Sequence, residues 1–104
     1  VMIDGRKVMT VNAVKGNANK KIYQVFTYKH HSNLKPSQVR IAYINDYSSS
    51  SGDRNLRVDK IMIDGVSYQT EASLVYSTGN WSSLQCQPGY AESEWLHCNG
   101  YFQY

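Results

Sequence analysis

The sequence predicts an all-β domain, a β-sandwich of the jelly-roll type. Several short segments alternate apolar and polar residues, which is the period of a strand with one buried face. Residues typical of turns separate these segments, and no segment has the period of an amphipathic helix. With 104 residues, 41% apolar content and 18% charged residues, the chain is predicted to be one folded domain, residues 1–104.

Three predicted strands lie in the first half of the chain. Residues 8–14, 21–28 and 39–44 alternate in this way and are rich in β-branched and aromatic side chains. The polar stretches 16–19 and 31–36 between them are predicted to be a turn and a loop. This half therefore predicts a run of antiparallel strands.

Two copies of Met-Ile-Asp-Gly, at residues 2–5 and 62–65, predict two tight hairpins. Asp-Gly between apolar runs favours a two-residue turn, because both turn positions need a positive φ. A further strand is expected over residues 56–63. Its apolar positions change parity between Val58 and Ile61, which suggests a bulge.

Residues 45–59 form a polar segment rich in Asp, Asn and Ser that leads into this strand. The candidate donors are the side chains of Asp46, Asp53 and Asn55 and the carbonyl of Arg54, with Asp59 behind them. Hard oxygen donors on a flexible loop suit Ca²⁺. The spacing excludes an EF-hand loop. The alternative is a turn between strands that binds no metal, since turns favour the same residues.

The two cysteines, Cys86 and Cys98, predict one disulfide and hence an oxidising, extracellular compartment. Two free buried thiols are the alternative. Residues 80–82 read Asn-Trp-Ser, which makes Asn80 a candidate glycosylation site. No apolar run approaches the length of a membrane span. Because Val1 falls within a predicted strand, we expect the sequence to be a piece of a longer secreted protein.

The net charge of +3 arises from an uneven distribution, with eight Lys or Arg residues and one acid in residues 1–45. The basic residues are scattered along predicted strands and no RNA-binding signature accompanies them, so we expect no nucleic-acid partner. Catalysis is also not expected. Glu92 and Glu94 lie two apart on one strand and cannot flank a scissile glycosidic bond from opposite sides.

Four segments together resemble the calcium-dependent xylan-binding modules of carbohydrate-binding family sixty. They are residues 53–61, 63–65, 68–72 and 93–100, the last being the most specific. The resemblance is strong from residue 41 onward and weak before it. It implies a non-catalytic β-sandwich jelly roll in which a loop-bound Ca²⁺ binds neighbouring hydroxyls of a polysaccharide directly. Its implied metal-site residues are Asp46, Asp53, Arg54, Asn55, Asp59 and, for a second structural calcium, Glu71. The alternatives are that Asp59 orients the loop without binding the ion and that Glu71 is an ordinary solvated side chain.

Aromatic side chains are expected to complete sugar recognition, because the C–H face of a pyranose packs on an indole or phenol. Tyr47, Trp81, Trp95 and His97 are the candidates. Trp95 and His97 are two apart on one predicted strand and share a face, so both are expected to face outward if Leu96 between them points into the core. The alternative is that Trp95 is a core or rim tryptophan. The nine tyrosines of the chain also suit a glycan-facing surface, although tyrosine is common in strands generally.

The chain departs from the family pattern at its N-terminal end, where an opening strand is lacking and the residues are unusually basic. One explanation is a fragment of a larger polypeptide. The other is a strand supplied by a neighbouring copy, with residues 101–104 donated in return. The alternative function is therefore a structural subunit of an extracellular, glycan-associated fibre.

Overall fold

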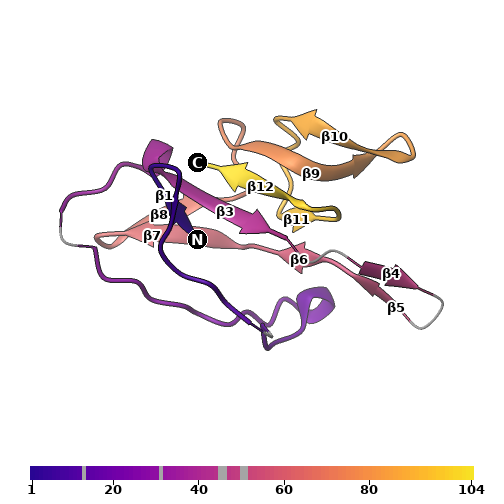
Figure 1. Ribbon diagram of the computed structural model, residues 1–104, viewed down its shortest axis with the longest axis horizontal. Coiled ribbons are helices and arrows are strands. Elements are labelled where there is room, and N and C mark those ends of the chain that lie inside the picture. Colours follow the sequence, from indigo (N-terminus) through magenta and orange to yellow (C-terminus); the bar gives the residue numbers. More distant parts are fainter. Residues whose placement is uncertain (13, 31, 45–46, 50–51) are drawn as a thin grey trace.

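A computed structural model describes residues 1–12, 14–30, 32–44, 47–49 and 52–104, with the backbone alone for residues 47–49 and 52–54. Its main element is a six-stranded sheet in the order β10-β9-β12-β3-β1-β2 (Figure 1). Every pairing within this sheet is antiparallel. Its strands are β1 (Met2–Ile3), β2 (Arg6–Lys7), β3 (Val39–Tyr43), β9 (Tyr76–Ser82), β10 (Gln85–Gly89) and β12 (Gly100–Gln103).

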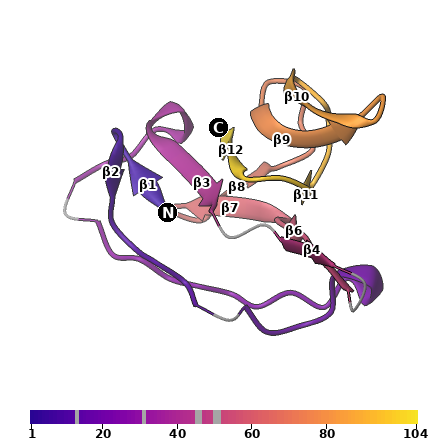
Figure 2. The same cartoon turned by 45° about the vertical axis from the view of Figure 1, so that its right-hand side comes forward.

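Three two-stranded ribbons complete the fold, namely β11-β6, β4-β5 and β7-β8. Their strands are β4 (Tyr47–Ser49), β5 (Gly52–Arg54), β6 (Leu56–Arg57), β7 (Lys60–Ile63), β8 (Val66–Gln69) and β11 (Trp95–Leu96). Figure 2 shows β6, β7 and β8 in a layer below β3, β12 and β9. The helical turns in the described residues are two short 3₁₀ segments, η1 (Ala18–Lys20) and η2 (Pro36–Gln38).

The core lies between these two layers. Leu96 from β11 is fully buried against Phe102 of β12, Tyr43 of β3 and Val75. Leu56, Val58 and Tyr104 pack around this cluster. The predicted all-β class is confirmed, and the layered core is consistent with a β-sandwich. The jelly-roll connectivity stays a prediction.

Both Asp-Gly hairpins are confirmed. Ile3 pairs with Arg6, and Ile63 pairs with Val66, so each hairpin has a two-residue loop. Asp4 and Gly5 have φ values of 51° and 78°, and Asp64 and Gly65 have values of 50° and 81°. These are the positive angles that the turn requires, which aspartate tolerates and glycine adopts freely.

The predicted strands at 8–14 and 21–28 are wrong for the residues described there. These residues have no strand structure apart from a single bridge between Asn17 and Ile22. Alternation alone does not make a strand, because a strand also needs a partner and a buried face. In residues 21–28 the side chains of Ile22, Val25, Phe26 and Tyr28 remain exposed, up to 86% for Val25.

The predicted strand at 39–44 is confirmed as β3, and the expected strand at 56–63 is divided into β6 and β7. At the division the chain changes partners. The N–H of Val58 donates to Glu94 O at 2.8 Å, whereas the carbonyl of Asp59 accepts from Thr70 N at 3.1 Å. The parity change therefore marks a change of partner strand, and the predicted bulge is wrong.

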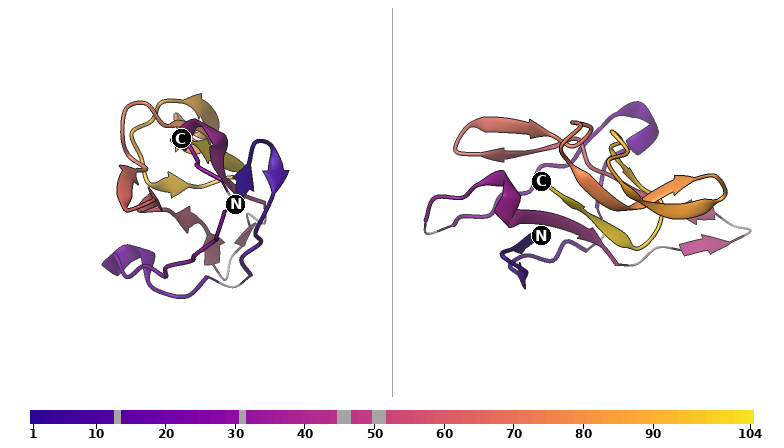
Figure 3. Two further views of the ribbon diagram at one scale, coloured as in Figure 1. Left: turned by 90° about the vertical axis from the view of Figure 1, so that its left-hand side faces the viewer. Right: turned by 90° about the horizontal axis from the view of Figure 1, so that it is seen from above.

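The predicted disulfide is present. It joins Cys86 of β10 to Cys98, whose Cα atoms are 6.4 Å apart. Figure 3 shows, from above, that β9 and β10 lie next to β12 and the neighbouring end of β11. Among the described residues, no helix has the length and apolar character needed to cross a membrane.

Candidate functional site

The acidic segment folds largely as a hairpin. Strand β4 pairs with β5 in antiparallel register, which places Ser48 opposite Asp53 and Tyr47 opposite Arg54. Asp46 lies outside the described residues, as do the side chains of Tyr47, Asp53 and Arg54. This register sets the backbone of Arg54, whose carbonyl is a candidate metal ligand, beside β4.

Asn55 follows β5 directly and precedes β6, and its side-chain oxygen Oδ1 is buried. In the next ribbon Leu56 pairs with Leu96, and Arg57 pairs with Trp95. Extended by one residue, this antiparallel register sets Asn55 beside His97. The pairing of β6 with β11 thus brings the predicted metal loop to the predicted sugar-binding residues.

Trp95 and His97 lie on one face of this ribbon. Their rings are stacked, with centroids 5.9 Å apart and planes tilted by 13°. Leu96 between them is 0% exposed and points into the core, as the alternation predicts. The burial of Leu96 therefore fixes which face Trp95 and His97 present.

Arg57 of β6 links this strand to Glu94 and to Ala18, a role that the sequence did not indicate. Its Nε and Nη2 atoms donate to Glu94 Oε1 at 3.1 and 2.7 Å, and its Nη1 donates to the carbonyl of Ala18 at 2.8 Å. The hydrogen bond to Glu94 raises the pKa of Arg57. Its guanidinium also lies 5.1 Å from the centre of the Trp95 ring and 5.9 Å from that of Tyr23. No local sequence pattern indicates this role, because Glu94 and Ala18 lie far from Arg57 along the chain.

Trp81 is the most exposed of the candidate aromatic residues whose side chains are described, at 51%. Its backbone N–H donates to Nδ1 of His97 at 3.2 Å, and the N–H of His97 donates to the carbonyl of Gly79 at 2.8 Å. Trp81 is therefore adjacent to His97. The structure brings together Asn55, Trp81, Trp95 and His97 around the junction of β6, β9 and β11.

Asp59 and Glu71 lie near Tyr104. Burial is the main cause that raises the pKa of Tyr104, and the negative charges of Glu71 and Asp59 raise it further. The hydroxyl of Tyr104 forms a 2.6 Å hydrogen bond with that of the buried Thr70. Within the described part of the chain, no three His, Cys, Asp or Glu side chains form a group that could hold a metal.

The donor chemistry of the loop fits calcium. Carboxylate, carboxamide and carbonyl oxygens are the atoms that Ca²⁺ prefers. The buried Oδ1 of Asn55 adds a donor that is withdrawn from water at the end of the hairpin. Two predicted carboxylate ligands, Asp46 and the side chain of Asp53, lie outside the described residues.

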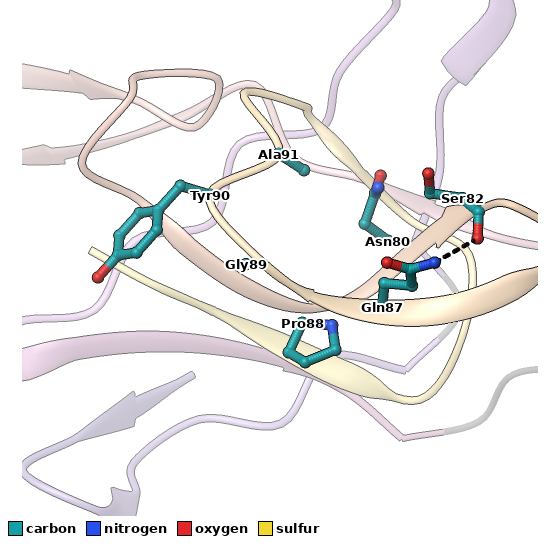
Figure 4. A pocket seen from close by; sticks show the side chains of 7 residues that line it. All are labelled: Asn80, Ser82, Gln87, Pro88, Gly89, Tyr90 and Ala91. Carbon is teal, nitrogen blue, oxygen red and sulfur yellow. Dashed lines mark hydrogen bonds between the residues drawn. The ribbon is translucent and has the colours of Figure 1, made fainter.

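Asn80, the predicted glycosylation site, lies in the middle of β9 and lines a shallow pocket between β9 and β10 (Figure 4). Its partner across the ribbon is Gln87. Its side chain is half-buried.

Comparison with known proteins decides the family. Residues 1–78 match the family model of CBM60, described as a Ca-dependent carbohydrate-binding module that binds xylan. The chain belongs to CBM60. The match includes residues 1–40, where the resemblance was expected to be weak, and it ends before residues 93–100, which were expected to be the most specific.

A relative of the chain is endo-1,4-beta-xylanase Xyn11B of Cellvibrio japonicus, which is 41% identical over 58 residues. The aligned region covers 56% of this chain and 16% of the xylanase, so the CBM60 chain spans only a small part of that protein's length. No solved structure gave a significant match. CBM60 is a family of binding modules without catalytic activity, and its described ligand is xylan.

Proposed function

We propose that this CBM60 chain binds xylan through a calcium ion held by residues 45–59, part of whose coordination shell stays open to the sugar. The observation that carries the proposal is the family match over residues 1–78. That range contains the whole acidic segment and all six candidate metal-site residues, which are Asp46, Asp53, Arg54, Asn55, Asp59 and Glu71. The hairpin geometry and the oxygen donors support the same assignment.

The chain's own residues have distinct roles in this proposal. Asp46, Asp53 and Asn55 hold the ion through side-chain oxygens, and Arg54 does so through its carbonyl. When bound, calcium supplies coordination positions that accept two neighbouring hydroxyl groups of a sugar. Asp59, which lies between β6 and β7, stabilises the loop from behind. Glu71 is the candidate ligand of a second, structural calcium.

The aromatic residues beside the loop differ in how much surface they offer. Trp95 is partly covered by the stacked His97 and the guanidinium of Arg57. Trp81 is half exposed and lies next to His97, so it is the best platform for a pyranose ring. Tyr47, on the hairpin itself, is the remaining candidate. Trp95 and His97 then lie at the edge of the sugar-binding surface and mainly support Trp81.

The proposal includes a secreted, non-catalytic module that belongs to a larger xylan-degrading protein. The disulfide between Cys86 and Cys98 is typical of an oxidising compartment. The relative is named as an endo-1,4-beta-xylanase, of which the aligned region is a small part. Glu94, one of the two carboxylates considered for catalysis, forms a salt bridge with Arg57.

The test compares the wild-type chain with Asp53→Ala and with the control Asp64→Asn. The control also removes one carboxylate, and asparagine tolerates the left-handed turn position of Asp64. Two readouts are measured, namely xylan retardation in an affinity gel and thermal unfolding with and without calcium. Calcium at a hundredfold excess over its Kd should stabilise the wild type and the control by about 2.7 kcal/mol.

Asp53→Ala should lose both the thermal shift and the xylan retardation, as the wild type does with a chelator. Retention of calcium-dependent xylan binding by Asp53→Ala would refute the placement of the ion in this loop. Xylan binding that persists unchanged in the chelator would refute the metal-bridged mechanism as a whole.

A second candidate function is assembly through strand exchange between copies. The segment from Ile22 to Tyr28 has apolar side chains exposed to solvent, and its described residues have no strand partner beyond the bridge at Ile22. A segment of this composition can pair with an exposed sheet edge. In this case the fold would serve a glycan-associated fibre, and sugar binding would anchor it.

A further inference from the structure

Three tyrosines form a row across the outer face of the six-stranded sheet. Tyr90 contacts Tyr76 edge to face, with ring centroids 5.4 Å apart, and Tyr76 contacts Tyr101 at 6.5 Å. This face is opposite to the core, because the neighbouring residues Ser77 and Phe102 are buried on the other side. We call Tyr90, Tyr76 and Tyr101 the tyrosine row.

Arg40 holds the ring of Tyr101, at one end of the tyrosine row, in position. Its guanidinium lies 3.8 Å from the centre of the Tyr101 ring, and its Nε donates to Gln103 Oε1 at 3.1 Å. The amide of Gln103 in turn donates to the carbonyls of Ser37 and Val39. The charge of Arg40 is thus used to hold an aromatic ring in place, and the row is fixed before any ligand arrives.

A pocket of about 210 Å³ opens at the other end of the row, beside Tyr90. Figure 4 shows the side chains of Asn80 and Gln87 at one end of this pocket and Tyr90 at the other. Gln87 is held in position because its Nε2 donates to the carbonyl of Ser82 at 3.1 Å. None of the seven lining residues is charged; they are Asn80, Ser82, Gln87, Pro88, Gly89, Tyr90 and Ala91.

We propose that the tyrosine row and this pocket form a second xylan-contacting surface, on which a neutral stretch of the same polysaccharide chain binds without metal. The inference rests on the proposed function, since it extends the polymer beyond the calcium loop. Pyranose rings offer C–H faces that pack on phenol rings, and their hydroxyls pair with the amides of Asn80 and Gln87. An uncharged pocket is complementary to an uncharged sugar and gives an acidic glycan no counter-charge.

The exposure of the row agrees with this assignment. Tyr90 is 63% exposed, and Tyr76 and Tyr101 are half-buried, so their rings present flat surface rather than filling the core. A polymer benefits from such a surface because a second contact on one chain is intramolecular once the first has formed. The gain in affinity should therefore appear for long oligosaccharides and be absent for short ones.

The test measures calorimetric affinity for xylobiose and for xylohexaose in saturating calcium. Tyr90→Ala is compared with the wild type and with Tyr68→Ala, which removes a tyrosine from β8. Tyr90→Ala should bind xylobiose as the wild type does and bind xylohexaose about threefold to tenfold more weakly. Tyr68→Ala should match the wild type for both sugars.

Chemical-shift changes of the side-chain amides of Asn80 and Gln87 on addition of xylohexaose provide an independent readout. Unchanged xylohexaose affinity in Tyr90→Ala, together with unmoved amides, would overturn the second surface while leaving the calcium site intact. Loss of all xylan binding in Asp53→Ala or chelator concerns the proposed function only. A wild type that binds no xylan at all would overturn both.

Discussion

Removing the disulfide tests how the β11 region is held. The double substitution Cys86→Ser with Cys98→Ser opens a link between residues 12 apart in sequence. In the chain-entropy model, a closed loop of this length stabilises the folded state by about 3 kcal/mol, because it restricts the unfolded chain. Small domains are stable by roughly 5–15 kcal/mol, so the loss is a large fraction of the total.

The assay is urea unfolding followed by tryptophan fluorescence, in the presence and absence of a reductant. With a slope of about 1–1.5 kcal/mol per molar urea, the midpoint should fall by about 2–3 M. Reduction of the wild type should reproduce this fall, whereas the double variant should not respond to the reductant. A loss below about 1 kcal/mol would contradict the reasoning, because it would mean that other contacts already hold residues 86 and 98 together in the unfolded chain.

Two further predictions concern the chain end and the exposed segment. Because burial raises the pKa of Tyr104, the unfolded chain ionises first. The contribution of Tyr104 to the free energy of unfolding is therefore complete below about pH 10 and falls by about 1.4 kcal/mol per pH unit above it. Tyr104→Phe should reduce this loss of stability at alkaline pH, as measured by urea unfolding. If Ile22–Tyr28 mediates assembly, sedimentation of the wild type should show oligomers, and Val25→Lys should convert them to monomers. The control is Leu84→Lys, which changes an equally exposed side chain outside this segment and should leave the oligomers intact. A wild type that is monomeric at all concentrations would rule assembly out.

The local parts of the fold could be predicted from sequence. The two Asp-Gly turns depend on adjacent residues alone, and both hairpins have the expected register. The strand β3 and the inward orientation of Leu96 follow from alternation combined with burial. These features need no knowledge of distant partners.

The remaining features depend on pairing between distant segments. Residues 21–28 alternate as well as β3 does, yet their described part has no sheet beside it, so the same pattern gives strand in one place and exposed chain in the other. Strand β9, Tyr76–Ser82, is mostly polar and was missed. Its position is set by β10 and β12 on its two sides rather than by its own hydrophobicity.

In the candidate site, too, local features could be predicted from sequence and the pairing of distant segments could not. Sequence identified the acidic segment and the aromatic residues separately, but not the register that joins them. Arg57 was missed because its role requires three partners, Glu94, Trp95 and the carbonyl of Ala18, that lie 37, 38 and 39 residues away. No local pattern around Arg57 contains that information.

The register between β6 and β11 is therefore the feature on which the site depends. Because side chains alternate along a strand, a slip of one residue would turn Trp95 and His97 inward and expose Leu96. The partly buried Leu56 lies directly opposite the fully buried Leu96, and the apolar surface that these two leucines bury opposes that slip. The bond between Arg57 and Glu94 favours the same register through charge. Core packing on one face thus determines where the sugar-binding candidates lie on the other, and Asn55 comes next to them because it directly precedes Leu56.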